Sequence, residues 1–385
     1  MSEALTIVGA SVRAAAQSAL RAGIAPLAGD LFADVDLVAC CPARRVARYP
    51  HGLLSVVAGP QAGPWMYTGA LENHPALVAR MAEVRPLLGC GAAVLQEVRD
   101  PVRLAAVLAA AGLPALEVRT SPAELPRDGS FLRKPLRSAA GHHIAPVRGE
   151  LRDDASREWY YQRYAAGESC AAVYVAAQGR GVLLGVTRQL VGTPWSGAAR
   201  FAYAGSIGPL NLSATLERGF TELGSCLAEQ FALEGLFGVD AIVAGESVWP
   251  VEVNPRYTAS AEIVERAIEQ SVVGLHVAAC RDGKLPAAPR PQTSRCYGKA
   301  VLYALEATGV GQPAVERLLE LAGKKPGAWA DWPRVADIPA AGSSVRRGAP
   351  LVTCFADGMD EHQTLERLEA QAAEIRRMLA GTNAQ

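Results

Sequence analysis

The side chains best suited to chemistry in this sequence are two carboxylates and an amide that lie close together along the chain. Asp240 precedes Glu252, and Asn254 follows two residues after that glutamate. Carboxylate and amide oxygens suit Mg²⁺, which binds a few protein ligands, several waters and substrate phosphates. Mn²⁺ accepts the same oxygen ligands. Arg256 follows and could hold an anion.

A β-hairpin would bring these side chains together. The pattern predicts a strand at residues 239–244, a turn at residues 245–247 and a returning strand at residues 248–253. Strand side chains repeat every two residues, so Glu252 and Asn254 share a face that the acid on the opposite strand can reach. An ordinary edge hairpin with solvated acids would give the same local pattern. The rest of the chain must decide between such a hairpin and a metal site.

The hairpin resembles the magnesium-binding strand pair of the ATP-grasp superfamily. That family ends its nucleotide site with an acid followed further on by Glu-x-Asn, and x-Arg follows in the biotin-carboxylase-like branch. Asp240, Glu252, Asn254 and Arg256 match those positions. The resemblance implies ATP as substrate, with Mg²⁺ on the two acids and the amide, and a phosphate loop and an adenine clamp upstream.

Residues 131–144 match the phosphate loop. A strand, a Lys-Pro pair, a loop of small residues and a second strand resemble the flexible flap of ATP-grasp enzymes. Lys134 would face the phosphates, and backbone N–H groups from Ser138 to Gly141 would fold over them. The two histidines after Gly141 could donate to phosphate or be solvated loop residues.

Other residues complete the nucleotide site by the same resemblance. Gln162, with Arg163 beside it, matches the position that receives the adenine amino group. Glu168 matches the glutamate that takes the ribose hydroxyls with both carboxylate oxygens. Arg103 lies near the start of a helix predicted for residues 100–112, where the family usually has a lysine that reaches the phosphates.

Composition bounds the remaining possibilities. The chain has 385 residues, of which 50% are hydrophobic, enough for two or three domains. Lys plus Arg equals Asp plus Glu at 38 each, so no net charge favours nucleic acid or a membrane surface. The eight cysteines include no Cys-x-x-Cys pair and suit reduced thiols. We expect a cytoplasmic protein without a nucleic-acid or membrane partner.

Residues 1–98 predict a doubly wound α/β domain, because a strand, a small-residue turn, a helix, a strand and an acid follow one another. A further buried strand is expected at residues 53–57. The first turn lacks the glycines of a dinucleotide site. Ser11 and Arg13 could instead hold an anionic substrate group, or be a helix cap and a surface arginine.

The resemblance assigns the rest of the chain to an α+β ATP-grasp domain and a cap. Residues 99–284 would form the two lobes, with a helix over residues 258–280. Residues 292–385 would form a small β-rich C-terminal cap with a terminal helix. Lys299, at the start of a strand, is interpreted as a surface residue.

Among the branches, the chain looks most like the predicted ATP-dependent carboligases related to biotin carboxylase. The implied activity is that of an ADP-forming ligase joining a small-molecule carboxylate to an amine through an acylphosphate, with cofactor biosynthesis as a setting. Lys134 would stabilise the triphosphate and Arg256 would hold the carboxylate, and a homodimer would be unsurprising for this superfamily. Two alternatives stay open: a bicarbonate-dependent carboxylase of the biotin-carboxylase type, and a non-catalytic ATP-binding regulator.

Overall fold

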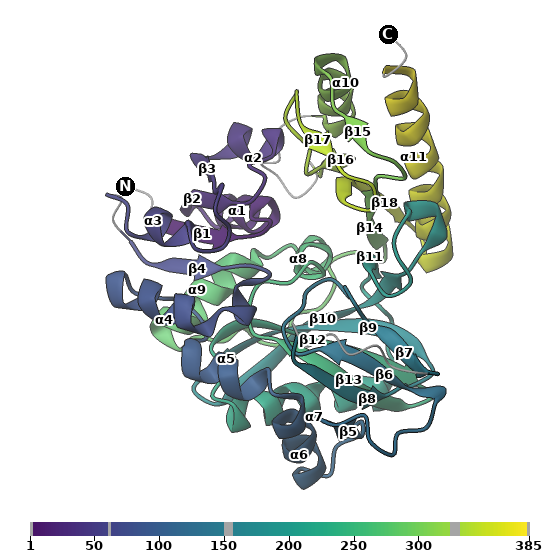
Figure 1. Cartoon of the computed structure of the whole chain (residues 1–385). Helices are drawn as coiled ribbons and strands as arrows, with labels where there is room; N and C mark the ends of the chain where they lie inside the picture. Colours follow the sequence, from purple (N-terminus) through teal and green to yellow (C-terminus); the bar gives the residue numbers. More distant parts are fainter. Residues whose placement is uncertain (1–2, 61–62, 150–156, 324–331, 383–385) are drawn as a thin grey trace.

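The structure, a computed structural model, describes residues 3–60, 63–149, 157–323 and 332–382. Its main sheets are a parallel sheet near the N-terminus, a small antiparallel sheet and a large antiparallel sheet that continues into the C-terminal part (Figure 1). In the described part of the chain, no helix is both long and apolar enough to span a bilayer.

The N-terminal sheet is parallel and has the strand order β3-β2-β1-β4. Its strands are β1 (Ala4–Gly9), β2 (Ala25–Asp30), β3 (Ala43–Arg45) and β4 (Trp65–Tyr67). The helices around it are α1 (Arg13–Arg21), α2 (Val35–Cys40), α3 (Leu53–Val57) and α4 (Pro75–Val84), with a short 3-10 helix η1 (Leu71–Asn73). Parallel strands end at one common edge, and ligands bind outside that edge in open α/β sheets.

The strand expected at residues 53–57 is wrong, because these residues form α3. A short apolar run does not distinguish a buried strand from a buried helix. Leu53, Val56 and Val57 still enter the core. The helix expected over residues 258–280 is divided into α8 (Ala261–Ile268) and α9 (Val272–Asp282), since Glu269 adopts a left-handed φ of 51°.

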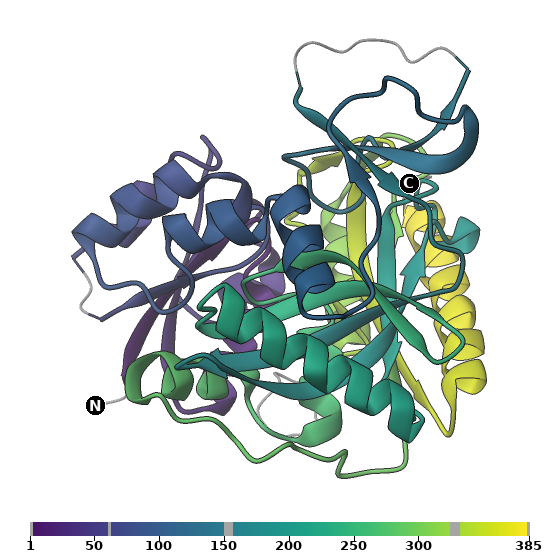
Figure 2. The same cartoon turned by 90° about the horizontal axis from the view of Figure 1, so that it is seen from below.

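The small sheet follows two short helices, α5 (Ala92–Val98) and α6 (Pro101–Ala110). Asp100 caps α6 by accepting hydrogen bonds from two backbone N–H groups of its first turn, as expected for an Asp-Pro start. The strand order is β5-β8-β6-β7, with β5 (Val118–Arg119), β6 (Asp128–Pro135), β7 (Ala145–Arg148) and β8 (Trp159–Arg163). This lobe projects from the body of the molecule in Figure 2.

The large sheet has the order β13-β12-β9-β10-β11-β14-β18-β16. Its strands are β9 (Glu168–Ala177), β10 (Arg180–Val191), β11 (Tyr203–Gly208), β12 (Gly235–Ala244), β13 (Ser247–Asn254), β14 (Cys296–Tyr303), β16 (Val335–Ala336) and β18 (Pro350–Gly358). The strands of the predicted cap thus extend the sheet of the predicted ATP-grasp domain, joined where β14 pairs with β11.

Helices cover this sheet and connect it to the N-terminal part. Helix α7 (Ala214–Gln230) packs on β10, while α9 packs on β12 and β9. The C-terminal helix α11 (Glu361–Thr382) lies on β18 and β14, and a helix α10 (Gln312–Ala322) and a pair of short strands, β15 (Thr308–Gly309) and β17 (Ser344–Val345), complete the end of the chain. Because α1 packs on α8 and α9, the N-terminal sheet is fixed against the large sheet by one shared hydrophobic core.

Candidate active site

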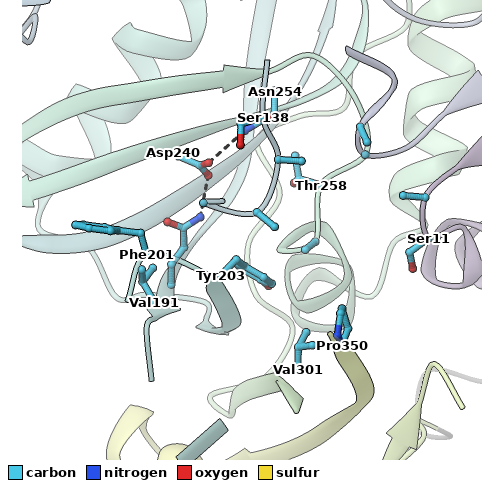
Figure 3. Close-up of a pocket in the computed structure, with 18 of the residues that line it drawn as sticks. Ser11, Ser138, Val191, Phe201, Tyr203, Asp240, Asn254, Thr258, Val301 and Pro350 are labelled. Carbon is cyan, nitrogen blue, oxygen red and sulfur yellow. Dashed lines mark hydrogen bonds between the residues drawn. The ribbon is translucent and has the colours of Figure 1, made fainter. Parts of the chain in front are cut away.

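One cavity of about 1220 Å³ lies between the three parts of the molecule. Ser11 comes from the N-terminal domain, Asp240 from the large sheet, and Val301 and Pro350 from the C-terminal strands, and all four line it (Figure 3). The cavity exceeds the ~300–1,000 Å³ usual for a small-molecule site. It has room for a nucleotide and further substrates.

The predicted hairpin is confirmed as β12 and β13, and it places the three proposed metal ligands at one wall of the cavity. Asp240 pairs with Glu252 across the strands, and Gly238 pairs with Asn254. Asn254 Nδ2 donates to Asp240 Oδ2 at 3.2 Å, as marked in Figure 3, and Gln189 Nε2 donates to Asp240 Oδ1 at 2.8 Å. The two strands therefore bring two carboxylates and an amide together, as the spacing predicts.

The two carboxylates have opposite electrostatic environments. Burial and the neighbouring Glu252 raise the pKa of Asp240 from 3.8 to about 6. Burial also disfavours a charged Glu252, but Arg99 and Lys134 outweigh that effect and hold its pKa below the ordinary value. At neutral pH both groups are negative, as a site for a divalent cation requires.

The donor set fits Mg²⁺. In the described residues, no group of three or more His, Cys, Asp or Glu could hold a metal by itself. The set here has two carboxylates and one amide, which leaves positions for waters and phosphate oxygens, as Mg²⁺ prefers. Asp240, Glu252 and Asn254 would hold the ion, and the ion would supply positive charge to the phosphates when bound.

Lys134 and Gln162 are buried side by side on adjacent strands of the small sheet. Lys134 Nζ donates to Gln162 Oε1 at 3.0 Å, and Gln162 Nε2 donates to the carbonyl of Val251 at 3.2 Å. Although burial opposes the charge of Lys134, Tyr160 and Glu252 keep its pKa above the ordinary value. Lys134 is therefore a cation facing the cavity from the small sheet, across from the metal hairpin.

The loop after β6 lies along the cavity, as expected for a phosphate flap, and both Ser138 and Gly141 line it. Asn73 Nδ2 donates to the carbonyl of Ser138 at 3.0 Å, so the N-terminal domain holds the loop. Gly141 has φ +74°, and a Cβ there would lie 1.8 Å from the carbonyl oxygen of Phe201. Only glycine permits this close approach of the loop to the segment that precedes β11.

Arg256 points into the cavity next to the metal hairpin and is compensated by Glu72. Its Nη2 donates to Glu72 Oε1 at 2.7 Å and to Asn254 Oδ1 at 3.1 Å, and its Nη1 donates to the carbonyl of Tyr257 at 3.1 Å. The Nε–H is buried and has no acceptor in the described part of the chain. Arg256 is thus held in place with one donor still available.

The prediction for Arg103 needs correction. Its side chain is 53% exposed, lies 3.4 Å from Glu97 and is absent from the cavity wall. Arg99, just before α6, lines the cavity instead and contacts Glu252 through Nη1. Its Nη2 donates to Asn73 Oδ1 at 3.4 Å. The basic residue from this segment is Arg99, since the buried face of α6 turns Arg103 to the surface.

Glu168, predicted to bind ribose, also needs correction. Strand side chains alternate between faces, and Ser169 takes the cavity face, where its hydroxyl donates to Gln189 Oε1 at 2.9 Å. Glu168 therefore lies on the other face, 3.8 Å from Arg188. Arg163 contributes to the cavity wall, but its guanidinium pairs with Glu117 at 2.9 Å, away from the buried Gln162.

The far end of the cavity contains a buried cluster of charged residues that was not predicted from the sequence. Arg13 contacts Glu262 and binds Asp337 at 3.0 Å, and Lys299 binds Glu262 at 2.9 Å. Arg13 and Lys299 are only 2% and 5% exposed. The interpretation of Arg13 and Lys299 as surface residues is therefore wrong, because acidic partners from distant parts of the chain compensate their buried charges. Short-range sequence patterns do not reveal such pairs.

Comparison with known proteins agrees with this geometry. Residues 98–260, which contain the small sheet, the loop after β6 and the β12–β13 hairpin, match the family model described as the ATP-grasp domain. Residues 98–260 are an ATP-grasp domain. The curated proteins contain no match to it.

Solved structures share the ATP-grasp fold over nearly the whole chain. L-amino acid ligase from Bacillus licheniformis has a TM-score of 0.70 at 13% identity, covering 97% of each chain. N5-carboxyaminoimidazole ribonucleotide synthetase from Thermus thermophilus has a TM-score of 0.67 at 17% identity, and the match covers 97% of this chain and 98% of that one. A third structure is the biotin carboxylase domain of 2-oxoglutarate carboxylase from Hydrogenobacter thermophilus, in complex with MgADP and bicarbonate. It has a TM-score of 0.70 at 12% identity, and the match covers 94% of this chain and 88% of that one. At these identities the likeness establishes the fold.

Proposed function

We propose that this ATP-grasp protein is an ATP-dependent, ADP-forming ligase that joins a small-molecule carboxylate to an amine. The observation that carries the proposal is the convergence of Asp240, Glu252 and Asn254 with the buried Lys134 around one cavity. Oxygen ligands for a cation beside a buried ammonium group suit a triphosphate.

The proposed chemistry is phosphoryl transfer followed by amide formation. Lys134 binds the triphosphate, Gln162 fixes the position of Lys134, and the loop from Ser138 to Gly141 closes over the phosphates. Mg²⁺ on the hairpin would supply charge neutralisation. Arg256, through its free Nε–H, holds the carboxylate that receives the γ-phosphoryl group, and the amine then displaces phosphate from the acylphosphate. ADP and phosphate are released.

Arg99 takes the phosphate-facing role predicted for Arg103, because Arg99 contacts Glu252 while Arg103 lies beside Glu97 at the surface. The neighbours support a ligase in general terms: one is an L-amino acid ligase, one is a ribonucleotide synthetase and one is the biotin carboxylase domain of a carboxylase. ATP, a carboxylate and an amine are accordingly the proposed substrates, and a homodimer is the proposed assembly.

The test is ADP release, measured with a panel of carboxylates and amines, with and without Mg²⁺. We expect Mg²⁺-dependent ADP formation that requires one carboxylate and one amine together. Asp240→Ala should reduce the rate at least a hundredfold, because one of two metal carboxylates is lost. ADP release with bicarbonate as the sole carboxylate would contradict the ligase assignment, and absence of ATP binding would contradict the site.

A further inference from the structure

We propose that Glu72 binds the incoming amine and accepts its proton as the amide bond forms. The inference rests on the proposed ligase activity and identifies the amine subsite within the same cavity. Glu72 lies on η1, directly after β4, at the carboxyl edge of the N-terminal sheet. It lines the cavity together with Arg256.

Glu72 is a buried carboxylate with one oxygen in use and the other without a partner. Its side chain is 1% exposed. Oε1 accepts from Arg256 Nη2 at 2.7 Å, while Oε2 is buried and has no hydrogen-bond partner in the part of the chain that the structure describes. A buried acceptor without a hydrogen-bond partner destabilises the folded protein. A ligand that donates an N–H to Oε2 would remove that destabilisation.

The position of Glu72 places this free oxygen next to the reacting carbon of the proposed reaction. Arg256 holds the acyl group, so a residue bonded to Arg256 lies within a few ångströms of that group. The other carboxylates beside the arginine are occupied: Gln189 and Asn254 donate to Asp240, and Arg99 contacts Glu252. Within the described residues, Glu72 is the only carboxylate that forms an ion pair with Arg256.

The amine must lose protons at this place for the reaction to proceed. A primary amine arrives as an ammonium ion, whose nitrogen has no lone pair for attack. Glu72 Oε2 accepts one proton, and the nitrogen lone pair then forms the C–N bond as the C–O bond to phosphate breaks. The bonding pair leaves with phosphate, which also takes the second surplus proton from nitrogen. One proton on Glu72 and one on phosphate complete the balance.

Glu72 could instead serve only to orient Arg256. The two roles differ in which half-reaction they affect. Glu72→Gln keeps an amide oxygen to accept from Arg256 but removes the proton acceptor. If the carboxylate acts on the amine, this variant still forms the acylphosphate and fails at amine attack. If the carboxylate acts only through the arginine, acylphosphate formation and amine attack change to the same extent.

The experiment compares two nucleophiles in wild type and Glu72→Gln, with ATP, Mg²⁺ and the carboxylate found in the ADP-release panel. Hydroxylamine is largely uncharged at neutral pH and attacks acylphosphates without help, and the amine from the panel is protonated. We expect Glu72→Gln to form hydroxamate within threefold of wild type. Amide formation at pH 7 should fall at least a hundredfold, within the range of general-base catalysis.

The pH dependence gives a second, independent readout. Amide formation by Glu72→Gln should rise about tenfold per pH unit below the pKa of the amine, because only the free base reacts. Wild type should rise less steeply over the same interval. A variant profile parallel to wild type, or loss of hydroxamate as large as the loss of amide, would overturn the proposal.

Glu265→Gln is the matched control for stability. Glu265 is also a fully buried glutamate paired with an arginine, Arg21, but it lies outside the cavity wall. This variant should keep the wild-type pH profile whatever stability it loses. If wild-type protein forms no hydroxamate with any carboxylate of the panel, the proposed ligase function itself is contradicted. A failure of the Glu72 proposal alone is different, because wild type then still forms hydroxamate.

Discussion

Arg99 contacts Glu252 through Nη1, so a cation from the loop between α5 and α6 lies on a carboxylate of the proposed metal site. The same guanidinium approaches Asn254 Oδ1 at 3.5 Å. A positive group thus lies where the metal and phosphates are proposed to bind, and it keeps Glu252 ionised. The contact couples the N-terminal half of the chain to the metal hairpin.

Arg99→Ala should therefore lower kcat/KM for ATP by about 10–100-fold, which corresponds to about 1.4–2.8 kcal/mol of lost interaction. Arg103→Ala is the matched control, because that arginine is exposed and faces away from the cavity. It should stay within twofold of wild type. Steady-state kinetics at saturating Mg²⁺ distinguish the two, and an equal effect of both changes would contradict the placement of Arg99.

The nucleotide clamp gives a second comparison. Gln162→Ala should raise KM for ATP about tenfold, because Lys134 loses the acceptor that fixes its position. Glu168→Ala should change KM by less than twofold, since its side chain lies on the opposite face of β9 near Arg188. A large loss in the Glu168 variant alone would restore the ribose role predicted from the sequence.

The phosphate flap depends on one glycine. Gly141→Ala should reduce kcat at least tenfold, because the new Cβ would collide with the carbonyl of Phe201 and displace the loop. Gly112→Ala is the control: it has a similar φ of +70° but nothing within 4 Å of the added Cβ. The control should lose only about 1–2 kcal/mol of stability from the left-handed backbone. Equal activity in both variants would argue against a closed flap.

Asp240 predicts a pH dependence with a definite sign. Its folded-state pKa of about 6 lies above the ordinary 3.8, so the folded protein binds the proton more tightly than the unfolded chain. The stability it contributes is complete below pH 4 and is lost as the pH rises through 6. Between pH 4 and 7, the free energy of unfolding of metal-free wild type should fall relative to Asp240→Asn by about 1–3 kcal/mol.

Urea unfolding of both proteins at several pH values measures this difference. Mg²⁺ and ATP should oppose the loss in wild type above pH 6, because only the ionised carboxylate binds the ion, and should have little effect on the Asn variant. A difference that stays constant from pH 4 to 7 would show that Asp240 has an ordinary pKa.

The sequence predicts the β12–β13 hairpin well because its information is local. Turn residues, strand alternation and the spacing from Asp240 to Asn254 are all contained in one short segment, and the structure brings them together as expected. Lys134 and Gln162 lie on adjacent strands of the small sheet although they are far apart in sequence, and their prediction comes from the family resemblance and not from local spacing.

The errors arise where the deciding information is long-range or absent from the pattern. From Cys170 on, β9 is buried on both faces, so no polar alternation indicates which face Glu168 takes. Arg99 and Arg103 are one turn apart, and only the packing of α6 decides which arginine reaches the hairpin. Local spacing does not single out Glu72 within its polar loop, because its importance comes from Arg256, far away in sequence.

The central claim is tested most directly by following oxygen from the carboxylate to phosphate. The substrate carboxylate is labelled with ¹⁸O, and the phosphate released with ADP in a complete reaction is analysed by mass spectrometry. An acylphosphate intermediate predicts one ¹⁸O atom in each phosphate released, with the amide formed in equal amount. Unlabelled phosphate, or AMP and pyrophosphate in place of ADP and phosphate, would contradict the account.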